Sequence, residues 1–228
     1  MTIFAPLAMR TARMERRLSP RLGLACAALA LLMLTSCLGA SMDVTMRANG
    51  SGRIVVEYRV SEELESLGRF DGNERWHAIP VGRADLERSV ARIQGLRIAS
   101  VSSSAGGGDL VTRATLDFDN PDALLAFLDS TGTRATLAQA GGRNVLRLVV
   151  LDPSPPIESA ELLSLFREVS AGYEIRFDFR LPRNASIATI PANVPEVRAQ
   201  ANGANVSFAV ATGDLPAIAD GLVVEITW

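Results

Sequence analysis

The segment from Gly172 to Leu181 alternates strictly between apolar and charged side chains. Its apolar positions are Tyr173, Ile175, Phe177, Phe179 and Leu181, and its charged positions are Glu174, Arg176, Asp178 and Arg180. Because successive side chains of a β-strand point to opposite faces, this pattern puts one row against a core and the other in water. The sequence therefore predicts a sheet that is covered on one face and solvated on the other.

Two Asn-Gly pairs, at 49–50 and 202–203, interrupt further alternating segments. Asn-Gly readily adopts the positive φ angles that a tight hairpin turn requires. We therefore expect hairpins over residues 41–61 and 197–211, and a third through the glycines at 141–142. Hairpins pair neighbouring strands in the antiparallel direction.

Single helices are predicted between these hairpins. The segments are 84–94, 157–169, a short turn after Thr212, and a helix opened by Asn120-Pro121-Asp122, in which Asn caps and Pro occupies the first turn. Strict strand–helix–strand alternation is absent. The predicted fold class is therefore α+β: a mostly antiparallel β-sheet built from hairpins, with helices packed on one face. We expect one domain over 41–228, or two lobes joined near the Pro-rich stretch 152–156.

The N-terminus has the pattern of a lipoprotein signal peptide. An apolar run of 13 residues, 22–34, follows several arginines and is too short to span a bilayer, which takes about 20 helical residues. Leu34-Thr35-Ser36-Cys37 at its end reads as a lipobox. We expect residues 1–36 (with Met14 as an alternative start) to be removed by cleavage between Ser36 and Cys37. Residues 37–40 then form a lipidated N-terminus, and Cys37 carries the anchor to the membrane on the extracytoplasmic side of the cell envelope.

The charge balance after this cleavage excludes some partners. Every basic residue is arginine, and the chain from residue 37 holds 18 of them against 24 acidic residues, a net charge of −6. Such a surface argues against nucleic acid as a partner and against electrostatic adhesion to anionic lipid. Cys26 would leave with the signal peptide, so the mature domain has neither a free thiol nor a disulfide.

Candidate catalytic groups are few. His77 is the single histidine and has no partner at metal-ligand spacing, so we expect no metal and no cofactor. Ser102 to Ser104 lack a G-x-S-x-G context, and Gly106 to Gly108 join strand to strand rather than strand to helix, unlike a phosphate loop. Residues 102–108 are expected to be a flexible connection.

Several charged groups allow a functional and a structural interpretation. Asp117 with Asp119, or Glu62 with Glu63 and Glu65, could form carboxylate pairs, but solvated or capping acids are the commoner case. Arg176 and Arg180 with Glu174 and Asp178 could bind a ligand, and cross-strand ion pairing is the simpler alternative.

The order of these features resembles the LppM-like family of bacterial envelope lipoproteins. The matching segments are Ala48-Asn49-Gly50-Ser51-Gly52, Ile54-Val55-Val56-Glu57-Tyr58, Gly95-Leu96-Arg97, Phe118-Asp119-Asn120-Pro121-Asp122-Ala123-Leu124 and the terminal strand 222–228 ending in Trp228. The resemblance implies an α/β envelope domain that binds lipid or glycolipid. It supplies no catalytic residues to carry over.

Three functional hypotheses follow. We expect a non-enzymatic, membrane-anchored envelope lipoprotein whose domain binds a lipid, glycolipid or other amphipathic ligand. The first alternative is a structural or assembly component of an envelope protein complex. The second is a hydrolase with an unrecognised site, which would bring His77 close to acids or serines.

Overall fold

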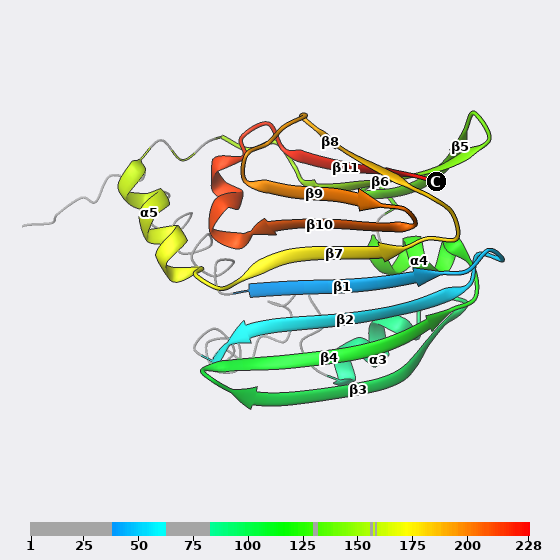
Figure 1. Ribbon diagram of the computed structural model, residues 1–228. Coiled ribbons are helices and arrows are strands. Elements are labelled where there is room, and N and C mark those ends of the chain that lie inside the picture. Colours follow the sequence, from blue (N-terminus) through cyan, green and yellow to red (C-terminus); the bar gives the residue numbers. More distant parts are fainter. Residues whose placement is uncertain (1–37, 63–82, 130–131, 156, 158) are drawn as a thin grey trace, which may run out of the picture.

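The computed structural model describes residues 38–62, 83–129, 132–155, 157 and 159–228. Within these ranges the chain forms two β-sheets, three α-helices and one 3-10 helix (Figure 1). The predicted lipobox and signal peptide, with Ser36 and Cys37, lie outside the described residues, as do His77, Glu63 and Glu65.

The larger sheet has seven strands in the order β3-β4-β2-β1-β7-β10-β9. Their bounds are β1 Leu38–Met46, β2 Gly52–Ser61, β3 Leu96–Gly106, β4 Asp109–Phe118, β7 Glu174–Arg180, β9 Val197–Asn202 and β10 Asn205–Ala211. Every neighbouring pair is antiparallel except β1 and β7, which run parallel at the centre. A parallel pair needs a long crossover, and here the connection includes β2 to β6 and three helices.

The smaller sheet has four antiparallel strands in the order β5-β6-β11-β8. Their bounds are β5 Ala135–Ala140, β6 Arg143–Leu151, β8 Ser186–Ile190 and β11 Leu222–Thr227. This sheet packs over one face of the larger one at the β7, β10 and β9 side. Its inward residues, among them Leu146 and Ile226, belong to the same apolar core as Val44 and Phe118 of the larger sheet.

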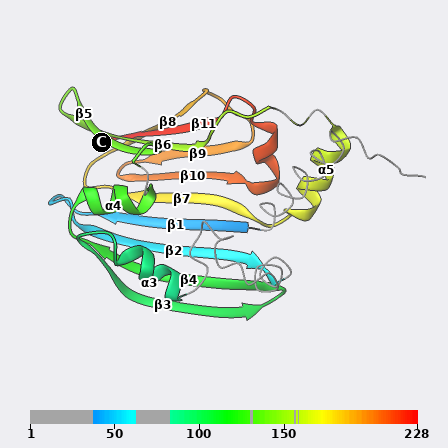
Figure 2. The same ribbon diagram turned by 180° about the vertical axis from the view of Figure 1, so that it is seen from behind.

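Helices α3, Arg83–Val90, and α4, Pro121–Leu128, cover the remainder of that same face (Figure 2). They contribute Leu86, Val90 and Leu124 to the core. Local chemistry sets the start of α4: the Asn120 side chain accepts a hydrogen bond from the backbone N–H of Ala123 at 2.9 Å. Such a cap stabilises a helix by about 1 kcal/mol.

Helix α5, Ala160–Val169, stands apart from the two-layer body. It packs chiefly against the 3-10 helix η1, Thr212–Ala217, with Phe166 as its buried residue. Figures 1 and 2 both place it at the end of the larger sheet where β1 begins.

The predicted α+β class, with mostly antiparallel strands and helices on one face of the main sheet, is confirmed. The division into two sheets is additional to the prediction. Residues 102–106 differ from the expected flexible connection: they extend β3 and pair with β4 through Gly106. Pairing with a neighbouring strand outweighs the low strand propensity of serine and glycine. Only Gly107 and Gly108 remain as the turn, with φ angles of 68° and 86°.

Candidate functional site

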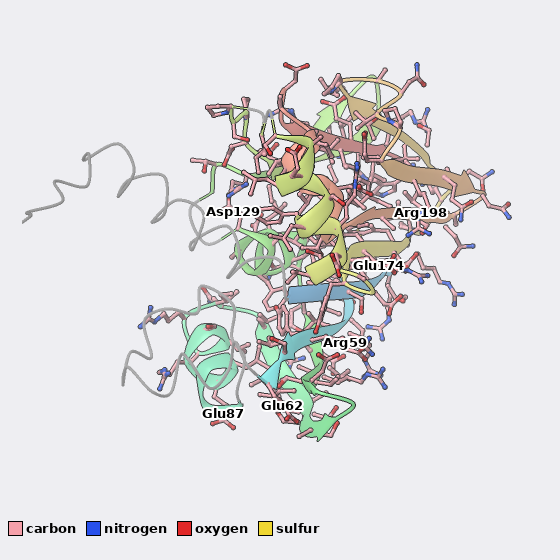
Figure 3. All side chains as sticks on the ribbon, turned by 90° about the vertical axis from the view of Figure 1, so that its left-hand side faces the viewer. Arg59, Glu62, Glu87, Asp129, Glu174 and Arg198 are labelled. Atoms are coloured by element: carbon pink, nitrogen blue, oxygen red, sulfur yellow. The ribbon has the colours of Figure 1, made fainter. Side chains whose placement is uncertain are left out.

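The uncovered face of the larger sheet is strongly charged. We call it the open face and define it by the outward residues of β1, β2, β4 and β7, such as Asp43, Glu57 and Arg176. Figure 3 looks along the strands, with Arg59, Glu174 and Arg198 on this side of the sheet and Glu87 and Asp129 on the other. Alternation along each strand produces this separation, because the odd residues of β1 face outward while Val44 and Met46 face the core.

Ion pairs cover much of the open face and its margins. The N–O distances are 2.8 Å for Arg53–Asp117, 2.7 Å for Arg97–Asp119, 3.5 Å for Arg59–Asp109, 2.6 Å for Arg176–Asp178 and 2.6 Å for Arg198–Glu174, and Arg113 pairs with Glu57. Exposed pairs of this kind contribute at most about 1 kcal/mol each. Their main effect is to hold the positive and negative side chains of this face in fixed positions.

The two acids considered as a carboxylate pair each bind a different arginine: Asp117 accepts a hydrogen bond from Arg53, and Asp119 accepts one from Arg97. The charged row of β7 is likewise engaged in structural contacts. Arg180 donates to the side chain of Asn205 on β10 at 3.4 Å. Arg176 pairs with Asp178 within β7, and Glu174 pairs with Arg198 of β9, so cross-strand ion pairing is seen at Glu174.

Asp43 and Asp178 lie side by side at the centre of the open face, because β1 and β7 pair them directly in register. Burial raises the pKa of Asp43, and the neighbouring Asp178 carboxylate raises it further, while Arg176 and Arg113 lower it. Two shallow hollows of about 390 and 580 Å³ share Asp43, Asp178 and Arg176. Their lining suits a polar, hydrated group.

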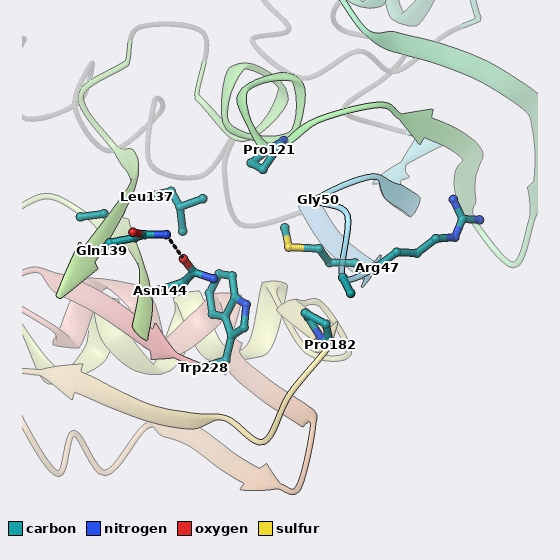
Figure 4. Close-up of a pocket in the computed structure, with 11 residues that line it drawn as sticks. Arg47, Gly50, Pro121, Leu137, Gln139, Asn144, Pro182 and Trp228 are labelled. Carbon is teal, nitrogen blue, oxygen red and sulfur yellow. Dashed lines mark hydrogen bonds between the residues drawn. The ribbon is translucent and has the colours of Figure 1, made fainter. Parts of the chain in front are cut away.

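A more apolar cavity of about 270 Å³ lies at the end of β1 that carries Met46 (Figure 4). We call it the Trp228 pocket. Its lining combines Met46, Pro121, Leu137, Pro182 and Trp228 with the polar Arg47, Gln139 and Asn144. It draws on the end of β1 and its turn into β2, the start of α4, the β5–β6 hairpin, Pro182 in the segment after β7, and Trp228.

Backbone pairing fixes the aromatic wall of this pocket. The N–H of Trp228 donates to the carbonyl of Asn144 at 3.0 Å, and the N–H of Asn144 donates back at 2.9 Å. The Gln139 amide nitrogen donates to Oδ1 of Asn144 at 3.4 Å. On the opposite side Gly50, with φ 83°, lies so close to Pro121 that a Cβ there would be 3.1 Å from its Cδ. The guanidinium of Arg47 extends away from this cavity and donates to Oγ of Ser51 at 3.3 Å (Figure 4). An apolar wall with amide groups beside it suits one end of an amphipathic molecule.

The other sequence candidates that fall within the described residues lie apart from these hollows. Ser102 to Ser104 lie exposed on edge strand β3, where the Ser103 hydroxyl is 3.0 Å from that of Thr112. Glu62 is exposed, and its backbone N–H donates to the carbonyl of Gly108 at 2.9 Å. Gly106 to Gly108 lead from strand to strand, as expected from the sequence.

Within the described ranges, no three His, Cys, Asp or Glu side chains gather closely enough to hold a metal ion. No helix in the same part of the chain has the length and apolar character needed to cross a bilayer.

Comparisons with known proteins give a distant likeness in fold. Neither a family model nor a curated protein matches the chain. Among solved structures, it is similar to the NMR structure of the folded domain of LppM from Mycobacterium tuberculosis. The identity is 12% and the TM-score 0.46, over 83% of this chain and 88% of that chain. The identity is too low to place the chain in the LppM-like family.

Proposed function

We propose that this chain is a membrane-anchored bacterial lipoprotein of the cell envelope, without enzymatic activity, whose domain binds an amphipathic ligand such as a lipid or glycolipid. The Trp228 pocket is the observation that carries the ligand proposal. It combines an indole, Leu137 and two prolines with the side-chain amides of Gln139 and Asn144 in one cavity. Apolar lining with a few oriented polar groups is the usual composition of a small-molecule site.

The anchor proposal rests on the sequence 34–37 and on the position of β1. Leu38, the residue joined to Cys37, is already the first residue of a central strand. An acyl group on Cys37 would therefore hold the start of β1 at the membrane. The net charge of −6 gives the domain no attraction of its own to anionic lipid, so the acyl chains would supply the attachment.

The Trp228 pocket lies at the far end of β1 from this anchor. Nine strand residues separate the two ends, which corresponds to about 26 Å. A ligand in the pocket would therefore be held on the solvent side of the domain, away from the bilayer that carries the anchor. We infer that its acyl or alkyl portion contacts Trp228 and that its polar portion lies beside the amides of Gln139 and Asn144.

Tryptophan quenching tests ligand binding directly. The chain has two tryptophans, so Trp76→Phe leaves Trp228 as the single fluorophore. A bromoalkyl glucoside, added below its micelle concentration, should quench Trp228 along a saturable curve. The same glucoside without bromine should compete. Quenching that rises linearly, as for free tryptophan amide, contradicts the ligand proposal.

The anchor has a separate test. Mass spectrometry of the N-terminal peptide from membranes should find Cys37 as the first residue, with acyl groups attached. Cys37→Ala should move the protein to the soluble fraction. An unmodified Cys37, or a Cys37→Ala variant that stays with the membranes, contradicts it.

A role in an envelope protein complex is the second candidate, favoured by an apolar groove of about 540 Å³. Ile190 lies in this groove with 47% of its surface exposed, and Leu151, Pro153 and Leu222 line it. Such a groove suits an apolar side chain of a partner protein. A photo-crosslinking residue at Ile190 should then capture one defined protein in intact cells, while the same residue at exposed Ala140 should not.

A further inference from the structure

The apolar face of α5 is wider than the surface on which the helix packs. Three large hydrophobic side chains are exposed among the described residues, and two of them, Leu165 at 41% and Val169 at 38%, lie one turn apart on α5. Phe166 is buried and Leu162 is half-buried. At 100° per residue the apolar side runs from Leu165 through Val169 and Leu162 to Phe166, and η1 covers only its far part.

This uncovered stripe lies at the end of the domain where β1 begins. Val169 precedes Tyr173 by four residues, and Tyr173 packs beside Gly39, where a Cβ would be 3.4 Å from its ring. Gly39 is two residues from Cys37. Figures 1 and 2 agree that α5 lies beyond the first residues of β1. An anchor on Cys37 would therefore bring the Leu165–Val169 stripe close to the bilayer.

The charges of α5 indicate which kind of surface it fits. Its one cation, Arg167, pairs with Asp214 of η1 at 2.7 Å, and the remaining charged residues of 160–169 are the acids Glu161 and Glu168. The helix thus has no spare cation for anionic headgroups, and contact must come from apolar burial.

We propose that the exposed stripe of α5, Leu165 and Val169, docks into the headgroup and acyl boundary of the bilayer that carries the Cys37 anchor. This rests on the proposed anchor. With both contacts at one end, the strands stand away from the membrane, and the Trp228 pocket is held at the distal end of the domain. One lipid attachment alone would leave the domain free to tilt; a second contact beside it fixes one orientation.

Environment-sensitive labels test the docking. In the mature, acylated protein the sequence provides no other thiol, so Leu165→Cys or Val169→Cys takes a single NBD label. Ala140→Cys, exposed at the end of β5 beside the distal hairpin, is the matched control. Each acylated variant is reconstituted into phosphatidylcholine vesicles, with and without nitroxide lipid.

We expect at least a two-fold rise in NBD emission at positions 165 and 169 on vesicle binding, with quenching by shallow nitroxides and little dependence on salt or anionic lipid. The label at 140 should stay solvent-like. If the protein floats with vesicles while all three labels remain solvent-like, the anchor holds and the docking inference fails. If emission at 165 rises only when a second envelope protein is added, a protein covers the stripe and the inference is wrong. If Cys37 is unmodified and the protein does not float, the anchor proposal fails and the docking inference fails with it.

Discussion

The hydroxyl of Tyr173 donates a hydrogen bond to Oδ1 of Asp109 at 2.5 Å, although 64 residues separate the two in the sequence. The bond runs from the residue before β7 to the first residue of β4 and passes the start of β1 at Gly39. Asp109 also pairs with Nε of Arg59 at 3.5 Å. Four strands are therefore tied together on the open face, at the end nearest the proposed anchor.

Removing this hydroxyl should weaken the fold. Tyr173→Phe keeps the ring over Gly39 but loses the bond to a carboxylate, and bonds to charged groups contribute about 1.5–3 kcal/mol. We expect a loss of that size in the free energy of unfolding, measured by urea denaturation. Asp109→Asn and the double variant complete a mutant cycle. Strictly additive losses would mean that the two side chains do not stabilise each other.

Gly52 should tolerate no side chain. A Cβ at this buried position would lie 2.1 Å from the carbonyl oxygen of Thr45 and 2.3 Å from Cζ of Phe118. We expect Gly52→Ala to lower the free energy of unfolding by about 1–3 kcal/mol or to prevent folding, because a packed core cannot absorb the added group. Gly106→Ala, with nothing within 4 Å, should change it by less than about 0.5 kcal/mol. Equal effects of the two substitutions would contradict the packing argument.

The strands were predictable because their signal is local. The alternation from 172 to 181 predicted β7, Glu174–Arg180, and the Asn-Gly pair at 202–203 predicted the turn between β9 and β10. Residues 102–106 were predicted wrongly because serine and glycine have weak local preferences, and a neighbouring strand decides their conformation. The parallel pairing of β1 with β7 depends on the packing of the whole chain, which no local window contains.

The same limit applies to the candidate sites. Asp43 meets Asp178 only because β1 and β7 pair in that register. The Trp228 pocket is built from five separate segments, so its residues carry no common motif. One usable signal was present: a large aromatic residue at the end of a hydrophobic strand, Trp228, with Gln and Asn across a predicted hairpin. The predicted lipidation at Cys37 lies outside the described residues and stays a prediction.

Tyr58 should resist ionisation. Burial raises its pKa to about 12, from the usual 10.0 of a tyrosine. The folded state then holds this proton more tightly than the unfolded state, so the stabilisation is complete below pH 10 and is lost as the pH rises to 12. Two pKa units correspond to roughly 2–3 kcal/mol. Tyr58→Phe should remove this alkaline loss in unfolding experiments between pH 9 and pH 12.

Absorbance of the phenolate offers an independent measurement. The chain contains two tyrosines, so Tyr173→Phe leaves Tyr58 as the single titrating phenol. Its midpoint should lie near pH 12 while the protein stays folded, and near pH 10 in urea. A midpoint near 10 in the folded protein would contradict the burial of this side chain.

Two carboxylates of the open face should respond to pH with opposite signs. Burial, followed by repulsion from Asp178, raises the pKa of Asp43 above the usual 3.8 of an aspartate. Stability from the protonated form is therefore complete below pH 3.8 and is lost as the pH rises through the folded pKa. Asp43→Asn should therefore gain stability relative to the wild type between about pH 4 and pH 7.

Asp117 has the opposite shift. A hydrogen bond from Arg53 lowers the pKa of Asp117, so its contribution to stability is present above pH 3.8 and is lost in acid. Asp117→Asn should accordingly lose stability at pH 7 and little at pH 3, which makes it the matched control in urea unfolding at several pH values. Asp178→Asn should also lower the pKa of Asp43 in a carboxyl NMR titration. If both Asn variants at 43 and 117 shift stability in the same direction, the electrostatic pattern assigned to the open face is wrong.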